Sequence, residues 1–152
     1  MQYVIVAAGR WKAGPERDLY EKFEKRIQPS LLLKEVDQKR KGSKVERLRR
    51  EGIILLNAVP DGARIIAMDE NGKNLSSMGL ANQLQHWRNA GVQKTAFLIG
   101  GADGHDTNVL EGANLILSLG PQTWPHMMVR FMIAEQIYRA QSILTGHPYH
   151  RE

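Results

Sequence analysis

The segment Ser118-Leu-Gly-Pro-Gln-Thr-Trp-Pro-His126 determines how the last third of this chain folds. A short apolar run ends at it, and a long apolar stretch follows it. Glycine and proline interrupt regular structure, and proline is favoured at the first position of a helix. The sequence therefore predicts a strand over 114–118, a loop rich in exposed main chain over 119–124, and a helix from Pro125 to about Leu144.

The same alternation of strand and helix extends toward the N-terminus. Leu19, Phe23 and Ile27 recur at helical spacing, and Ser43 with Glu46 forms a capping-box pattern. Strands are expected over 3–8, 31–36, 63–68 and 94–99, and helices over 15–28, 43–58, 76–90 and 107–112. This order predicts an α/β fold, a mostly parallel sheet with helices on both faces, in a single domain spanning 1–152.

Composition excludes several classes of protein. The 152 residues include no cysteine, so disulfides, thiolate metal ligands and a cysteine nucleophile are excluded. No apolar run approaches the length of a membrane span, and residues 1–10 resemble a first strand more than a signal peptide. The five histidines form no metal-ligand pair at helical spacing, so a metal site is not expected. The expected location is the cytoplasm.

Positive charge is concentrated in one segment. The chain has a formal net charge of +5, and Lys34–Arg50 contains eight basic and three acidic residues, an excess equal to that of the whole chain. Such a segment is either a solvated loop and helix face or a surface that binds the phosphates of RNA.

Three segments follow the carboxyl ends of predicted strands: Asp69–Lys73, Gly100–Gly104 and Leu119–Trp124. Ligands of parallel α/β sheets bind beyond these ends. If the strands are neighbours, the segments form one pocket built chiefly from main chain, with Met68, Leu119 and Trp124 as apolar walls. Such a pocket suits a ligand containing adenine. The alternative is three unrelated turns.

The final helix is apolar almost all round over its first half, so both of its sides must be covered. A second subunit would cover the side that does not face the sheet; burial beneath the chain's own loops is the alternative. Arg130 is positioned to reach a phosphate or a carboxylate. Glu135 and Arg139 have the spacing of a structural ion pair.

The chain ends in His147-Pro-Tyr-His-Arg-Glu152, a dense group of proton-transfer and anion-binding side chains. Histidine can act as a base near neutral pH, and arginine can bind phosphate. The alternative is a frayed end. A catalytic tail would have to be held against the pocket or against a partner subunit.

Four segments together resemble the SPOUT family of RNA methyltransferases. They are Leu98–Gly104, Thr123–Arg130, Glu135–Ala140 and Pro148–Glu152, and Ala67–Lys73 fits the same pattern. The resemblance covers the whole chain and is strongest to small members that modify large-subunit ribosomal RNA. It implies an α/β knot, in which the C-terminal segment forms a trefoil knot around the cofactor site.

The resemblance also implies an activity. The cofactor would be S-adenosylmethionine, and the reaction would be methyl transfer to N3 of a pseudouridine in large-subunit (23S) ribosomal RNA, on assembled ribosomes. The protein would be a homodimer with the final helix in its interface.

Site residues follow from the resemblance, position by position. The cofactor contacts would be Met68, Gly100, Leu119, Gly120, Pro121, Gln122, Thr123 and Trp124. Met68 replaces a common leucine, which preserves an apolar wall, and 120–122 is variable, so its contacts would be through main chain. In the tail, His150 is the candidate base, and Tyr149 and Arg151 would orient the nucleobase or bind phosphate.

Two other functions are consistent with the same pocket. One is a SPOUT methyltransferase acting on transfer RNA, although such enzymes usually have an additional RNA-binding domain. The other is a non-catalytic module that binds an adenine nucleotide or RNA. A Rossmann-type methyltransferase is disfavoured because its glycine loop follows the first strand, where Gly9-Arg-Trp is a poor match.

Overall fold

The structure, a computed structural model, describes residues 1–37 and 41–151. Over these residues a five-stranded parallel sheet has the order β2-β1-β4-β3-β5. Its strands are β1 (Gln2–Ala8), β2 (Leu31–Val36), β3 (Arg64–Asn74), β4 (Lys94–Ile99) and β5 (Leu115–Ser118). The helices are α1 (Pro15–Glu24), α2 (Lys44–Asn57), α3 (Ser77–Asn89), α4 (Thr107–Gly112) and α5 (His126–Thr145). The predicted α/β class is confirmed. Lys39, Arg40 and Glu152, which belong to the predicted basic segment and tail, lie outside the described residues.

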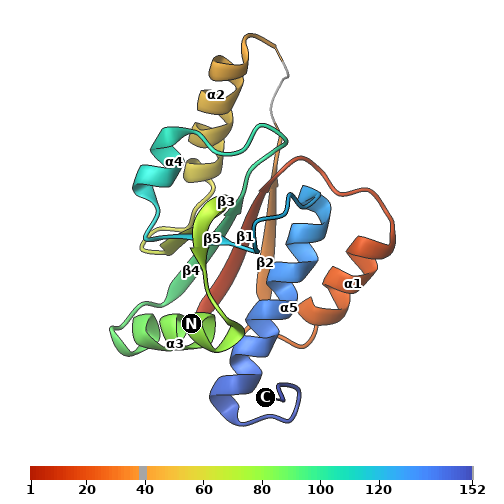
Figure 1. Cartoon of the computed structure of the whole chain (residues 1–152), viewed down its shortest axis with the longest axis vertical. Coiled ribbons are helices and arrows are strands. Elements are labelled where there is room, and N and C mark those ends of the chain that lie inside the picture. The colour runs from red at the N-terminus through yellow and green to blue at the C-terminus, as the bar shows by residue number, and fades with distance from the viewer. Residues whose placement is uncertain (38–40, 152) are drawn as a thin grey trace.

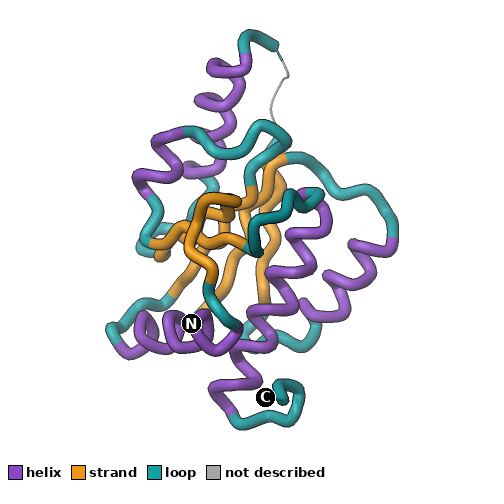
Figure 2. Tube along the Cα trace, viewed as in Figure 1, coloured by secondary structure: helices purple, strands orange, loops and turns teal. Residues whose placement is uncertain are grey.

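Helices cover both faces of the sheet, as Figures 1 and 2 show. Alternate side chains of β1 point to opposite faces: Tyr3 and Ile5 join the core beneath α1, α3 and α5, whereas Val4 and Val6 join the core beneath α2 and α4. Both faces are therefore apolar, which is typical of a central parallel strand.

Helix α5 packs against α1 and α3 of its own chain through a buried stripe that includes Ile133, Ala134 and Ile137. The first half of α5 keeps a second apolar side partly exposed, at Met127, Met128, Phe131 and Met132. The chain's own helices thus cover one side of α5 and leave the other open to solvent.

Two element boundaries differ from the predictions. The first helix ends at Glu24 and not near Gln28, because the chain passes into turns around Lys25 and Arg26. The segment Asp69–Lys73 was expected to be a loop, but β3 continues through it to Asn74 with a shift of register between Met68 and Lys73. Main-chain pairing of Lys73 and Asn74 with β5 continues the strand, and the register shift before them forms a β-bulge.

Candidate functional site

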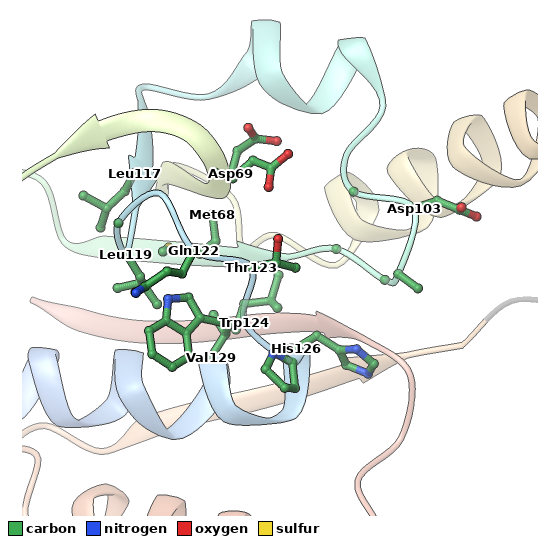
Figure 3. Close-up of a pocket in the computed structure, with 18 residues that line it drawn as sticks. Met68, Asp69, Asp103, Leu117, Leu119, Gln122, Thr123, Trp124, His126 and Val129 are labelled. Carbon is green, nitrogen blue, oxygen red and sulfur yellow. The ribbon is translucent and has the colours of Figure 1, made fainter.

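The bulge of β3 that begins after Met68 and the carboxyl ends of β4 and β5 border one cavity of about 690 Å³ (Figure 3). The strand order makes β4, β3 and β5 neighbours, so the segments after them converge at one edge of the sheet. The predicted convergence of the three strand-end segments is confirmed, and three unrelated turns are excluded. The volume lies within the range of small-molecule sites.

Seven of the eight predicted cofactor contacts line this cavity: Met68, Gly100, Leu119, Gly120, Gln122, Thr123 and Trp124. Pro121 is exposed and is not part of the lining. The cavity also includes Leu117, His126 and Val129, which sequence reasoning did not assign to it. Val129 lies four residues after Pro125, so helical spacing places it on the same side of α5 as the start of the helix. This spacing was the signal in the sequence that could have assigned Val129 to the cavity.

The described residues include no group of three or more histidine, cysteine, aspartate and glutamate side chains placed to hold a metal ion. Among the same residues, no helix is both long enough and apolar enough to cross a membrane.

Helix α2 holds the glycine segment that forms one wall of the cavity. The Gly101 N–H donates to Glu51 Oε1 at 2.8 Å, and Asp103 pairs with Arg47 at 3.2 Å and with Lys44 at 3.8 Å. Gly101 and Gly104 close the segment with a bridge. The basic helix and the wall of the pocket are therefore directly connected.

Gly100 is required for this wall, and its substitution gives a testable result. A methyl group on Gly100 would lie 2.6 Å from the carbonyl oxygen of Gly104. Relieving that overlap has to open the glycine segment, so we expect Gly100→Ala to lower the free energy of unfolding by about 2 kcal/mol. Urea denaturation measures this loss.

Gly112 supplies the control for that measurement. It is the last residue of α4, and nothing lies within 4 Å of a Cβ added there. Gly112→Ala should leave stability unchanged or slightly raised, because alanine favours the helix. Equal effects of the two substitutions would contradict the role given to Gly100.

Arg130 anchors the first turn of α5 beneath the cavity. Its side chain is fully buried, pairs with Glu35 Oε1 at 2.8 Å, and donates to the carbonyl oxygens of Ala8 and Gly9, both at 2.8 Å. Its guanidinium lies 5.2 Å from the ring centroid of Trp11. Burial lowers the pKa of Arg130, and the hydrogen bond that Arg130 donates to Glu35 opposes that change. Of the two ligands predicted for Arg130, the carboxylate is the one found.

The tail folds back onto the middle of α5. The Tyr149 hydroxyl donates to Glu135 Oε1 at 2.9 Å, and Arg139 pairs with the same oxygen, which confirms the predicted ion pair. Arg139 also approaches His150 Nδ1 at 3.4 Å and lies over the Tyr149 ring. Burial raises the pKa of Tyr149, and its hydrogen bond to Glu135 adds to this, so the phenol stays protonated and can donate. The described tail is therefore packed and not frayed.

Within one chain the tail does not reach the cavity. Neither Tyr149, His150 nor Arg151 lines it, and Arg151 is exposed. The cavity lies at the start of α5, whereas the tail contacts Glu135, nine residues and about 14 Å further along the helix. The described tail accordingly follows the end of α5 opposite to the helix start (Figure 1). The catalytic role of these three residues is still a prediction.

Known proteins resemble this chain over its full length. The family described as "Predicted SPOUT methyltransferase" matches residues 1–150. A protein of Paramagnetospirillum magneticum called ribosomal RNA large subunit methyltransferase H is 50% identical over 151 residues, 99% of each chain. Proteins of the same name from Rhodospirillum centenum and Rhodospirillum rubrum are 49% and 45% identical, again over 99% of each chain. A parallel sheet with a cavity at its carboxyl edge and a match from end to end lead to one conclusion: the chain belongs to the SPOUT methyltransferase family.

Proposed function

We propose that this protein uses S-adenosylmethionine to methylate N3 of a pseudouridine in the 23S RNA of assembled ribosomes in the cytoplasm. The observation that carries the proposal is the cavity between the bulge of β3 and the ends of β4 and β5, in a chain that belongs to a methyltransferase family. The names of its relatives support ribosomal RNA as the substrate.

The cavity fits an adenosyl cofactor. Met68, Leu119 and Trp124 provide apolar surface for the adenine, and the loop around Gly120 offers main-chain groups to its polar edge. Gly100 lines the cavity, and its lack of a side chain lets the glycine segment fold closely against Gly104, which shapes this wall. The knot that the family implies would form this loop from the C-terminal segment.

The bound cofactor supplies an activated methyl group on a sulfonium, so the protein needs no nucleophile of its own. Its residues must hold N3 in line with the methyl group, and positioning of this kind can contribute several kcal/mol. They must also accept the N3 proton, because the neutral imide nitrogen has no free lone pair. We assign proton acceptance to His150, and substrate orientation or phosphate binding to Tyr149 and Arg151.

A homodimer completes the proposed site. The side of α5 that carries Met127, Met128, Phe131 and Met132 is partly exposed, and a second copy would cover it. Since the tail is packed far from the cavity of its own chain, the partner's cavity is the one that it would complete. Sedimentation should therefore show a dimer.

One labelling experiment tests the activity and its target together. Radiolabelled S-adenosylmethionine is offered with whole ribosomes, free ribosomal RNA and transfer RNA in separate reactions. We expect label in the ribosome reaction alone. Label in transfer RNA would establish the rival SPOUT activity, and cofactor binding without any label would establish a non-catalytic module.

The basic segment should bind ribosomal RNA through phosphate contacts. Lys41, Arg49 and Arg50 are exposed on and before α2, which extends past the end of the sheet in Figure 1. Reversing these three charges to glutamate should weaken ribosome binding and flatten the slope of log affinity against log salt by about three.

Reversing Lys12, Lys22 and Lys25, exposed residues before, within and after α1, is the matched control. It makes the same change in net charge and should leave the salt slope unchanged. If both variants behave alike, α2 is not the RNA-binding surface.

A further inference from the structure

The cavity is acidic although the chain is basic. Asp69, Glu70 and Asp103 contribute to its lining, and the described lining residues include no lysine or arginine. The chain as a whole has a formal net charge of +5. The charge at the cavity is therefore opposite in sign to that of the protein, which favours a cationic ligand.

The three carboxylates are not equivalent. Asp103 is paired with Arg47 and Lys44, and Glu70 is exposed to solvent. Asp69 is half-buried and takes part in none of the ion pairs found among the described residues; its Oδ1 accepts the Asn71 N–H at 2.9 Å. Burial lowers the pKa of neighbouring His105, which therefore stays neutral and does not offset this charge. Asp69 is the carboxylate whose charge is left for a ligand.

The backbone fixes the position of Asp69. The register shift between Met68 and Lys73 sets residues 69–72 apart from the regular ladder, and Asp69 lines the cavity from there (Figure 3). Gly72 lies against β5 so closely that a methyl group there would be 2.7 Å from the carbonyl carbons of Ile116 and Leu117. The bulge is thus clamped, and bulges beside active sites commonly re-aim a side chain.

We propose that Asp69 determines the specificity of this pocket for the sulfonium form of the cofactor over its demethylated product, an inference that rests on the proposed function. When the methyl group is transferred, the sulfur–carbon bond breaks and its electron pair stays on sulfur. A carbon–nitrogen bond forms at N3, and the N3 proton goes to the base. The ligand therefore loses one positive charge, from a net +1 to zero. Asp69 attracts the first form and is indifferent to the second, which favours product release.

Calorimetric titration of the full-length protein with S-adenosylmethionine and, separately, with S-adenosylhomocysteine tests the proposal. The wild-type protein should bind the sulfonium more tightly. Asp69→Asn keeps the oxygen that accepts the Asn71 N–H and removes only the charge. We expect it to weaken sulfonium binding on the order of fivefold, as the loss of one partly screened charge contact predicts, and to leave product binding unchanged.

Asp61→Asn is the matched control, because Asp61 is exposed in the turn before β3 and does not line the cavity. It should change neither affinity. Equal affinities of the wild-type protein for the two ligands, or an equal loss of both in Asp69→Asn, would overturn the role of Asp69 while leaving the proposed function intact. If Asp69→Asn does not fold, two other measurements test the role of Asp69. They are the ratio of the two ligand affinities in the wild-type protein and the same ratio in Asp69→Glu, which should retain the preference for the sulfonium. A wild-type protein that bound neither ligand would overturn both proposals.

Discussion

Replacing His150 by alanine should reduce methyl transfer to ribosomes by about 100-fold or more, the usual contribution of a general base. Affinity for S-adenosylmethionine should stay within about twofold of wild type, since His150 does not line the cavity and a lost binding contact would alter affinity and not only turnover. Single-turnover methylation together with calorimetry separates these two quantities.

His86→Ala is the control, because His86 is exposed on α3 and has no assigned role. Wild-type methylation by His150→Ala would eliminate this residue as the base. Arg139 approaches His150 at 3.4 Å, so the tail has a defined position from which to act.

Mixing two inactive variants tests whether the tail acts on its partner. His150→Ala keeps an intact cavity. Gly100→Ala keeps an intact tail, and we expect its opened wall to prevent cofactor binding. In a symmetric dimer whose site combines both copies, a one-to-one mixture should recover about a quarter of wild-type activity. No recovery after subunit exchange would place tail and cavity of the same chain together.

Replacing Arg130 by methionine should lower the free energy of unfolding by about 3 kcal/mol. The substitution leaves Glu35 without its cation and removes the donors to the carbonyl oxygens of Ala8 and Gly9. Glu35 is 30% exposed, so solvent compensates part of the loss. Urea denaturation measures the change.

The surface pair Arg17–Glu21 provides the comparison. Its side chains are 49% and 40% exposed, and Arg17→Met should cost less than about 1 kcal/mol. If Arg130→Met also lowered the free energy of unfolding by less than about 1 kcal/mol, the Arg130–Glu35 pair would not fix α5 to the ends of β1 and β2.

Much of the fold was predictable because the relevant signals are local. Buried parallel strands are continuous apolar runs, and Ser43 caps α2 as its capping-box pattern with Glu46 indicates. The convergence of the strand-end segments was predictable only on the condition that β3, β4 and β5 are neighbours. Nothing local in the sequence establishes that order.

The features that sequence reasoning missed depend on contacts between distant residues. Residues 69–73 have the composition of a loop, and only pairing of Lys73 and Asn74 with β5 keeps them in a strand. The partner of Arg130 is Glu35, 95 positions away. Nothing in the sequence around Asp103 indicates that it pairs with Arg47, which is 56 positions away. In each case tertiary structure, and not local preference, decides the outcome.

Central to the proposed function is one adenosyl ligand bound where the bulge of β3 meets the carboxyl ends of β4 and β5. A crystal structure of the protein with S-adenosylhomocysteine tests it most directly. We expect the ligand's adenine between Met68, Leu119 and Trp124, with polar contacts to the main chain of 119–124 and close approach to Gly100. Ligand density at another surface, or a cavity that stays empty at saturating ligand, would contradict the account.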